Sequence, residues 1–252
     1  MELGIQGKYA LVTGATRGLG RAVASALAAE GVKVALVARD KDMLDTVIAE
    51  LGGSAMGHVA IPLDLMSQGS GQILHQELLS RTGSPDIIVH NLGGTLGIRE
   101  PLGNSSDYQQ VWQFNLGIAI DLNKLFLPAM VEKGWGRIVH VSSLSAVMVD
   151  SSLPYATAKA GLNAYIKGLG RELAPSGVVV SGIMPGPFLA EDGHWDRIAR
   201  EDPERYSKFC YERMAIQRLG TTEEITGIIT FLCSQQASFF SGCVVPVDGG
   251  MR

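Results

Sequence analysis

Tyr155 and Lys159 lie four residues apart, and this pair is the one in the chain best suited to proton transfer. On a helix this spacing places both side chains on the same face. A free phenol has a pKa of about 10, so keeping it ionised at pH 7 costs roughly 4 kcal/mol. A nearby ammonium offsets part of that cost by stabilising the phenolate. The spacing occurs by chance in many helices, so its meaning depends on the surrounding residues.

Upstream of this helix, two serines, Ser142 and Ser143, end the stretch 136–143, which is predicted to be a strand around the apolar run 138–141. In sheets of parallel strands, ligands bind at the carboxyl edge, where such hydroxyls could hold a substrate oxygen. Neighbouring side chains on a strand face opposite ways, so only one of the two serines is expected to face a ligand.

A glycine-rich turn, Thr13–Gly20, follows the predicted strand 9–12 and opens a helix. Gly14 and Gly18 allow backbone geometries that a side chain would block, and Gly20 allows a close helix–strand approach. The N-terminus of the helix then offers free N–H groups to a pyrophosphate. The strand–turn–helix order predicts a nucleotide-binding site.

Short apolar runs alternate with segments of helical period along the whole chain. Continuous apolar strands separated by helices favour an α/β fold, a doubly wound (Rossmann) parallel sheet of about seven strands with helices on both faces, in one domain over 1–252. The predicted strands are 9–12, 34–37, 59–61, 87–89, 138–141, 178–183 and 244–247. The predicted helices include 20–30, 41–51, 73–79 and 106–132.

The segment 187–217 interrupts this alternation and is too long for an ordinary connection, so we interpret it as a substrate lid. Asp202 and Pro203 predict the start of a helix within it, on which Tyr206, Phe209, Cys210 and Met214 share one face. An additional packing helix is the alternative interpretation. The first part of the lid carries a mixed set of polar and aromatic residues that could contact a polar substrate or face water: Glu191, Asp192, His194, Trp195, Asp196 and Arg197.

The composition excludes several classes of protein. Hydrophobic residues make up 46% of the 252 residues, which excludes a mainly disordered chain. The net charge of −4 argues against binding nucleic acid through a basic face. Pro175, Pro185 and Pro187 interrupt one uncharged stretch and polar residues interrupt another, so no membrane span is expected. Three widely spaced cysteines and a beginning that lacks an export signal favour a cytoplasmic protein, and no metal site is expected.

Thr13–Gly20 has the spacing G-x-x-x-G-x-G, which resembles the short-chain dehydrogenase/reductase family. Other motifs of that family stand in order over essentially the whole chain: His90-Asn91-Leu92-Gly93, Asn115, Ser143, Tyr155 with Lys159, Pro185-Gly186, and Pro246-Val247-Asp248-Gly249-Gly250. Within the family, the overall sequence pattern of the chain most resembles that of 3-oxoacyl-[acyl-carrier-protein] reductases. Many sugar, steroid and polyketide enzymes share this pattern.

The resemblance implies roles for individual residues. Tyr155 would be the proton donor, tuned by Lys159, with Asn115 holding a water that replenishes the proton. The residues expected to bind the cofactor are Gly14, Thr16, Arg17, Gly18, Leu19, Gly20, Arg39, Asp64, Leu65, Asn91, Gly93, Tyr155, Lys159, Pro185, Gly186 and Phe188. His90 and His140 are expected to be core histidines.

The substrate-binding serine depends on how the motif is counted. Counting from Gly136 and Arg137 gives Ser143, whereas counting back from Tyr155 by the family's commonest spacing gives Ser142. We choose Ser143, because a loop loses a residue more easily than a strand slips.

Two positions depart from the family pattern. Leu92 replaces an alanine beside the cofactor. Ala190 stands where a threonine often binds the carboxamide, which leaves that contact to backbone around Phe188.

Two arginines favour NADP(H) as the cofactor. Arg39 follows the second predicted strand, and Arg17 lies in the glycine turn, close to where a ribose 2′-phosphate would sit. Two guanidiniums form charge-assisted, bidentate bonds with a phosphate. The alternatives are that both are solvated surface charges, or that Asp40 holds the ribose of NAD.

We therefore expect a reversible NADP(H)-dependent ketone reductase acting on a small molecule, with a 3-oxoacyl thioester and a polyketide or sugar ketone as the candidate substrates. By resemblance, the molecule would be a homotetramer or dimer. The alternatives are an NAD-dependent alcohol or sugar dehydrogenase of the same family and a non-catalytic NADP(H) sensor. An epimerase or dehydratase is disfavoured, since such enzymes usually carry a substantial C-terminal substrate domain.

Overall fold

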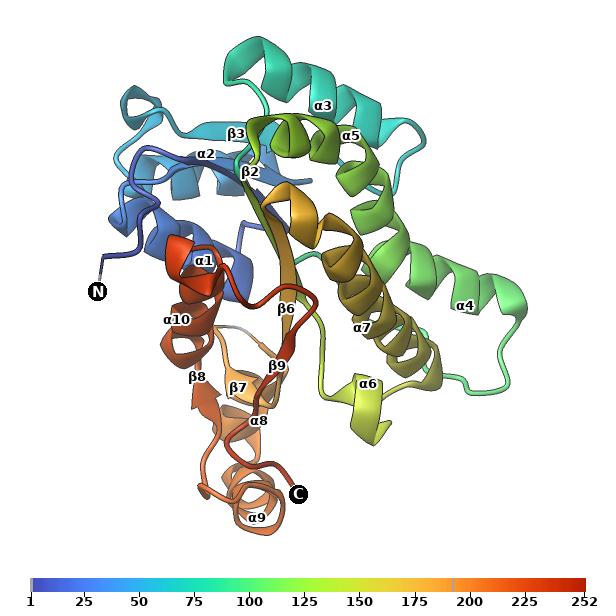
Figure 1. Ribbon diagram of the computed structural model, residues 1–252. Helices are drawn as coiled ribbons and strands as arrows, with labels where there is room; N and C mark the ends of the chain where they lie inside the picture. Colours follow the sequence, from blue (N-terminus) through green and yellow to red (C-terminus); the bar gives the residue numbers. More distant parts are fainter. Residues whose placement is uncertain (1, 192) are drawn as a thin grey trace.

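A seven-stranded parallel sheet in the order β3-β2-β1-β4-β5-β6-β9 forms the centre of the structure (Figure 1). The computed structural model describes residues 2–191 and 193–252. Each strand of the predicted set is present. Their bounds are β1 Tyr9–Thr13, β2 Lys33–Ala38, β3 Val59–Pro62, β4 Ile87–His90, β5 Gly136–Val141, β6 Val178–Pro185 and β9 Val244–Val247.

Helices cover both faces of the sheet (Figure 1). α1 (Gly18–Ala29), α2 (Lys41–Glu50) and α10 (Thr222–Leu232) pack on one face, where Val12 and Leu36 contribute to the core. α3 (Ser70–Arg81), α5 (Ile118–Lys133) and α7 (Leu153–Leu173) pack on the other. All six residues of β5 and all eight of β6 are buried, because parallel strands covered on both faces bury alternate side chains in each. The doubly wound architecture is thus confirmed.

The predicted helix 106–132 is interrupted in the structure. It consists of α4 (Ser105–Trp112), a π-helical turn (Gln113–Gly117) and α5. The amide of Asn115 donates to the carbonyl oxygen of Val111 at 2.8 Å inside this turn. π-Helical turns within α-helices are frequent at functional sites.

The same helical stretch has the length and apolar composition of a membrane-spanning helix. Within the described residues, Ser105–Lys133 alone is long and apolar enough to cross a membrane. Half of its most apolar window is buried, and Leu122, Phe126 and Met130 pack in the core beneath the sheet. A core helix passes the same test, so length and composition carry little weight here.

The segment predicted as a lid lies beyond the carboxyl ends of the strands (Figure 1). It contains α8 (His194–Glu201), which the sequence analysis did not predict, and α9 (Pro203–Arg213). The predicted cap is confirmed, because the carboxylate of Asp202 accepts the N–H of Arg205 at 3.1 Å. Asp192, one of the lid residues singled out above, lies outside the described residues.

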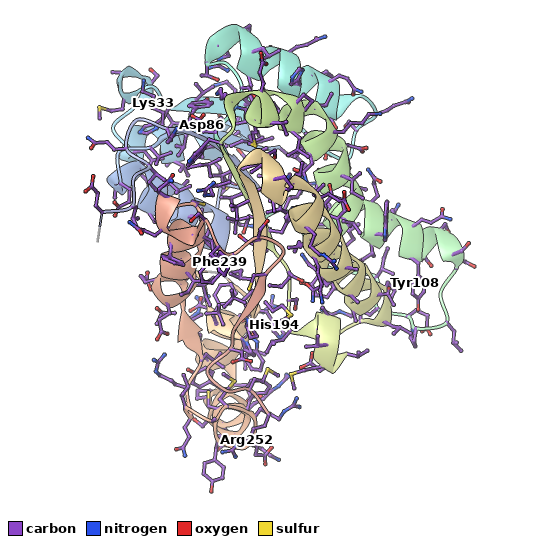
Figure 2. The ribbon with its side chains drawn as sticks, in the orientation of Figure 1. Lys33, Asp86, Tyr108, His194, Phe239 and Arg252 are labelled. Carbon is purple, nitrogen blue, oxygen red and sulfur yellow. The ribbon has the colours of Figure 1, made fainter. Side chains whose placement is uncertain are left out.

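A two-stranded parallel pair, β7 (Phe188–Leu189) with β8 (Gly220–Thr221), joins the two ends of this segment. The apolar face predicted for α9 is confirmed, because Cys210 and Met214 lie in a small separate core. The last residues of the chain pack against α9, where the backbone N–H of Arg252 donates to the carbonyl oxygen of Arg213 at 2.8 Å (Figure 2).

Candidate active site

Tyr155 and Lys159 occupy the first two turns of α7, whose N-terminal end lies at the carboxyl edge of the sheet next to α6 (Ser145–Met148) (Figure 1). The ammonium nitrogen of Lys159 lies 5.6 Å from the centre of the Tyr155 ring. The helix begins with Pro154 in its first turn, a position where the missing N–H of proline is not needed. The spacing therefore produces the shared face that the sequence predicted.

Lys159 is a buried cation, and no ion pair links it to a carboxylate in the part of the chain that the structure describes. Its side chain is 2% exposed, and Nζ donates to the carbonyl oxygen of Val141 at 2.7 Å. Burial lowers the pKa of Lys159 to about 7. An ammonium has three donors. One is committed to Val141, so the group is suited to ligand hydroxyls.

Burial raises the pKa of Tyr155, and the neighbouring Ser143 hydroxyl opposes that rise. The sequence analysis expected the ammonium of Lys159 to stabilise the phenolate. In this structure the desolvation of the phenol outweighs any such effect, because the Tyr155 side chain lies in a low-dielectric environment. The phenol is therefore held as a proton donor, which is the form that carbonyl reduction requires.

Ser143 and Ser142 have different surroundings. Ser143 is partly exposed and lies against Tyr155, and its Oγ accepts the N–H of Ser145 at 3.1 Å. Ser142 is 2% exposed, and its Oγ donates to the side-chain oxygen of Asn163 at 2.5 Å. The hydroxyl beside the phenol thus belongs to Ser143, as the count from the strand predicted.

Asn115 holds the loop that follows β4. Its side-chain oxygen accepts the N–H of Gly94 at 2.9 Å, and its amide donates to the carbonyl oxygen of Gly94 at 2.8 Å. A Cβ on Gly93 would lie 2.7 Å from the Asn115 oxygen and 3.0 Å from the Lys159 ammonium. Gly93, Asn115 and Lys159 therefore meet at one point, and only glycine fits between the other two.

The glycine turn is braced by Asn91 at the end of β4. The amide of Asn91 donates to the carbonyl oxygens of Thr13 and Gly14, both at 3.1 Å. A Cβ on Gly20 would lie 2.2 Å from the Gly14 oxygen, which explains the glycine at this position. Asn91 was predicted to bind the cofactor, and both donors of its amide are engaged in holding the turn.

The N-terminus of α1 fits a bound phosphate. No side chain caps this helix, and no acidic residue lies in its first turn, whereas Asp40 caps α2 and Thr221 caps α10. The N–H groups of the first turn therefore remain free for an anion. Thr16 is partly exposed at this turn, and the Leu19 side chain packs in the core behind it.

Arg17 and Arg39 are both exposed beside this turn, and no carboxylate lies within ion-pair distance of either in the described part of the chain. The carboxylate of Asp40 caps α2, since one of its oxygens accepts the N–H of Met43 at 3.1 Å. Asp64 likewise accepts the N–H of Met66, and the Leu65 side chain is buried in the core. Leu65 thus offers its backbone rather than its side chain to a cofactor.

The segment after β6 crosses close to the glycine turn. Pro185 ends β6, and the N–H of Gly186 donates to the carbonyl oxygen of Val247 at 2.9 Å. Phe188 lies in β7, and a Cβ on Gly18 would be 3.8 Å from that of Ala190.

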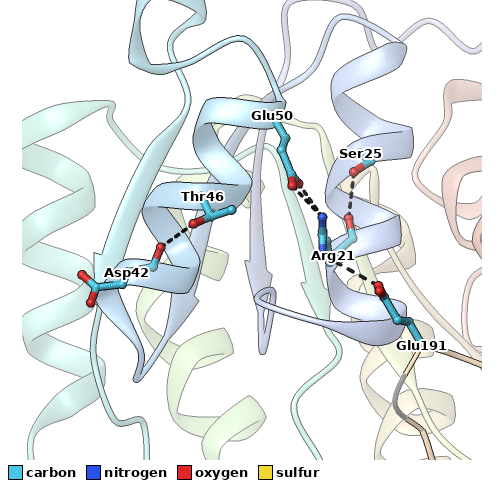
Figure 3. A network of polar contacts seen from close by, with 6 residues as sticks. All are labelled: Arg21, Ser25, Asp42, Thr46, Glu50 and Glu191. Atoms are coloured by element: carbon cyan, nitrogen blue, oxygen red, sulfur yellow. Dashed lines mark hydrogen bonds and ion pairs between the residues drawn. The ribbon is translucent and has the colours of Figure 1, made fainter.

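Arg21, directly after the turn, links the start of the lid to the nucleotide-binding half (Figure 3). One terminal nitrogen of its guanidinium, Nη2, donates to both carboxylate oxygens of Glu50, at 2.7 and 2.8 Å. The other, Nη1, lies 3.9 Å from a carboxylate oxygen of Glu191. The polar lid residue Glu191 is therefore tied to α1. Sequence reasoning did not identify Arg21, since the contact joins residues far apart in the chain.

Two buried histidines lie behind the site. His90 and His140 are registered neighbours on β4 and β5, and their ring centres are 4.6 Å apart. His90 contacts the side-chain oxygen of Asn123 at 2.8 Å, and burial lowers the pKa of His90 to about 4. The two ring nitrogens of His140 have no hydrogen-bond partner among the described residues. Both are core histidines, as expected.

Comparison with known proteins identifies the family. A family described as enoyl-(acyl carrier protein) reductase matches residues 14–252. A 3-oxoacyl-[acyl-carrier-protein] reductase of Aquifex aeolicus is 34% identical over 259 residues and matches all of both chains. The chain belongs to the short-chain dehydrogenase/reductase family. The expected family is thereby confirmed, and with it the assignment of the chain as an oxidoreductase.

Two solved structures of this family are similar over nearly their whole lengths. An L-sorbose reductase from Gluconobacter frateurii, complexed with NADPH and L-sorbose, has a TM-score of 0.91 at 28% identity, covering 100% of this chain and 98% of the other. A 3-oxoacyl-(acyl-carrier-protein) reductase from Agrobacterium tumefaciens, with NADP bound, has a TM-score of 0.89 at 30% identity, covering 98% and 95%.

Proposed function

We propose that this short-chain dehydrogenase/reductase uses NADP(H) to reduce a ketone, and in reverse to oxidise a secondary alcohol. The observation that supports this most directly is that the Tyr155 phenol lies beside the Ser143 hydroxyl, with the Lys159 ammonium 5.6 Å from the centre of its ring. These three side chains lie at the carboxyl edge of the sheet, to which the glycine turn after β1 also belongs. A proton donor, a hydroxyl for the substrate oxygen and a phosphate-binding turn therefore lie at the same edge of the sheet, where ligands of such folds bind.

Each group of the site has a separate role in the proposed carbonyl reduction. The nicotinamide, when bound, supplies a hydride to the carbonyl carbon. The Ser143 hydroxyl, oriented by the N–H of Ser145, donates a hydrogen bond to the developing alkoxide. Tyr155 gives its proton to that oxygen, and its raised pKa keeps the proton in place until then.

Lys159 and Asn115 support this step. The ammonium of Lys159 binds ribose hydroxyls and stabilises the phenolate that Tyr155 leaves behind. Asn115 fixes the loop at Gly93 and Gly94 against Lys159. By the family resemblance, Asn115 in the π-helical turn would also hold a water that returns a proton to Lys159.

NADP(H) is favoured over NAD(H) by the surroundings of the glycine turn. Arg17 and Arg39 have no carboxylate partner among the described residues and are suited to a 2′-phosphate, and Asp40 serves as a helix cap. The two solved relatives were complexed with NADPH and with NADP. An NAD-dependent dehydrogenase remains the alternative, and it predicts comparable catalytic efficiency with both cofactors.

The similar proteins act on different ketones, a sugar in one case and 3-oxoacyl chains in others. We propose a small-molecule ketone of one of these classes, with residues 187–217 as the lid over it. By the family resemblance we also propose a homotetramer or dimer in which the helices containing Asn115 and Tyr155 pack against their copies. Trp112 and Leu153 are exposed near these residues.

The test is a spectrophotometric screen of NADPH and NADH oxidation with ketoacyl, sugar and aromatic ketones, together with Tyr155→Phe. The proposal requires NADPH-dependent reduction of at least one ketone and its loss in the variant. If the protein bound NADPH, and Tyr155→Phe changed no activity with any ketone, a non-catalytic NADP(H) sensor would replace this proposal.

A further inference from the structure

The carboxylate of Asp150 connects the lid to the turn that follows β5. One of its oxygens, Oδ1, accepts the hydroxyl of Ser145 at 3.3 Å. The other, Oδ2, lies 3.8 Å from a guanidinium nitrogen of Arg213, the last residue of α9. Both α6, which begins at Ser145, and α9 lie at the lower end of the molecule in Figure 1. Asp150 therefore bridges two segments that are far apart in the chain.

Ser145 extends this connection to the hydroxyl beside Tyr155. Its backbone N–H donates to Oγ of Ser143 at 3.1 Å, while its own hydroxyl donates to Asp150. The Ser145 side chain is buried, which leaves it few other orientations. An oxygen that accepts the N–H of Ser145 keeps its own O–H free to donate to a substrate oxygen. The bonds of Ser145 thus fix the direction in which the Ser143 hydroxyl can act.

The backbone between these residues adopts a conformation that is rare for its sequence. Val149 has a φ of 54° and a ψ of 38°, in the left-handed region, which a β-branched residue seldom occupies. Its N–H donates to the carbonyl oxygen of Ser145 at 3.2 Å, so it closes the turn that directs Asp150 back onto Ser145. Strain of this kind persists where surrounding contacts hold it, and it gathers at functional sites.

On the side of the lid, Arg213 is held by the end of the chain. Its Nε donates to the carbonyl oxygen of Arg252 at 3.0 Å, and the N–H of Arg252 donates to the carbonyl oxygen of Arg213 at 2.8 Å. The neighbouring Met214 forms an antiparallel bridge with Met251. The guanidinium that faces Asp150 is therefore fixed relative to α9, and its position reports where α9 lies.

We propose that Asp150 is a positioning residue, which Arg213 of the lid holds in place and which orients the Ser143 hydroxyl through Ser145. This inference rests on the proposed function for its effect on catalysis. It couples the docking of α9 to carbonyl reduction, because a carboxylate that loses Arg213 is freer to leave Ser145. The turn that directs Ser143 then loosens.

The first experiment measures kcat and KM with NADPH and a ketone that the screen shows to be reduced. Asp150→Ala should lower kcat about 10-fold, as the loss of one hydrogen bond to a charged group would give, with the KM for NADPH little changed. Asp150→Asn keeps an oxygen that can accept from Ser145 and loses only the exposed ion pair, so its kcat should fall no more than about 5-fold. A wild-type kcat in Asp150→Ala would overturn the proposal.

The Ser143→Ala background decides whether Asp150 acts through Ser143. The hydroxyl to be oriented is absent there, so adding Asp150→Ala should lower the remaining kcat by less than about 2-fold. A general loss of structure would instead lower kcat by the same factor in both backgrounds, and that result would overturn the proposal. Urea unfolding of each variant establishes that it is folded under the conditions of the assay.

Hydrogen exchange of the cofactor-free protein tests the coupling without turnover. The amides of Ser145 and Val149 are bonded within the turn, so mass spectrometry of peptides covering 143–150 reports its stability. Arg213→Gln should raise exchange in these peptides, although the substitution lies on the lid. Lys208→Gln is the matched control, because it removes one charge from the same helix, from a pair with Glu212 that stays within α9.

The outcomes of this exchange experiment are separate from those of the activity screen. Unchanged exchange over 143–150 in Arg213→Gln, or an equal rise in Lys208→Gln, would overturn the coupling. If no ketone is reduced but the rise is specific to Arg213→Gln, the proposed function fails and the coupling between the lid and this turn stands. If ketones are reduced and the rise is absent, the proposed function stands and the coupling fails.

Discussion

The ammonium of Lys159 lies 5.6 Å from the centre of the Tyr155 ring while donating to the backbone of β5. The lysine is thus held by the sheet rather than by the phenol. Its position leaves the phenol with a raised pKa and a neighbouring hydroxyl from Ser143. This arrangement prepares Tyr155 to donate a proton and places a cation where it can stabilise the resulting anion.

Tyr155→Phe removes the proposed proton donor and retains the ring. Because general-acid catalysis contributes about 100- to 10,000-fold, we expect kcat to fall by that factor. NADPH binding, measured by quenching of protein fluorescence, is expected to change little. A variant with wild-type kcat would show that the proton comes from another group.

Ser143→Ala and Ser142→Ala are expected to have opposite effects. Ser143→Ala removes the hydroxyl beside Tyr155, so kcat should fall by about 100-fold or more with unchanged stability. Ser142→Ala leaves the Asn163 side chain without its partner, so the free energy of unfolding should fall by about 1–3 kcal/mol. Steady-state kinetics and urea denaturation of both variants test this, and the reverse pattern would assign the site to Ser142.

Arg39→Asp tests the cofactor preference. The change removes a proposed partner of the 2′-phosphate and introduces an acid suited to a ribose hydroxyl. We expect the ratio of kcat/KM for NADPH to that for NADH to fall by about 10- to 100-fold, which corresponds to the loss of one charge-assisted hydrogen bond. Arg171→Asp, an exposed arginine near the end of α7, is the control for the change in net charge. An unchanged ratio in Arg39→Asp would show that Arg39 does not bind the 2′-phosphate.

The buried Lys159 makes stability depend on pH. The pKa of Lys159 is about 7 in the folded chain, against the ordinary lysine value of 10.5 in the unfolded chain. Between these values the unfolded chain binds more protons, so the free energy of unfolding rises with pH by up to about 1.4 kcal/mol per unit. Below pH 7 both states bind the proton, and the cost of burying it is fully present.

Lys159→Met is therefore expected to abolish this rise in cofactor-free protein between pH 7 and 9.5. Urea unfolding at several pH values measures it, with Lys167→Met on the exposed side of α7 as the control. A Lys159→Met variant with the wild-type slope would show that the lysine is not desolvated in the folded state.

The stacked histidines should respond differently to the same substitution. His140→Leu removes two ring nitrogens that have no described partner, so we expect a neutral or stabilising effect. His90→Leu leaves the Asn123 oxygen unpaired in the core, and the free energy of unfolding should fall by about 1–3 kcal/mol. Urea denaturation of both variants compares them, and equal losses would indicate that His140 has a polar partner in solution.

The sequence alone determined the seven strands, the glycine turn and the shared face of Tyr155 and Lys159. The strands were visible as continuous apolar runs, the turn as spaced glycines and the shared face as a spacing of four residues, all of which are local features of the chain. The cap at Asp202 was predicted for the same reason. The helix 106–132 was less well predicted, because the π-helical turn follows from the bonds of Asn115 to Val111 and to Gly94.

Only the tertiary structure decided which residues from distant segments face one another. It brought Ser143 to Tyr155 and made Asn91 a brace for the glycine turn. Burial set the pKa of Lys159 at about 7, which spacing could not predict, because desolvation depends on everything packed around the group. Local patterns thus define the elements of this protein, and long-range packing defines the electrostatics of its site.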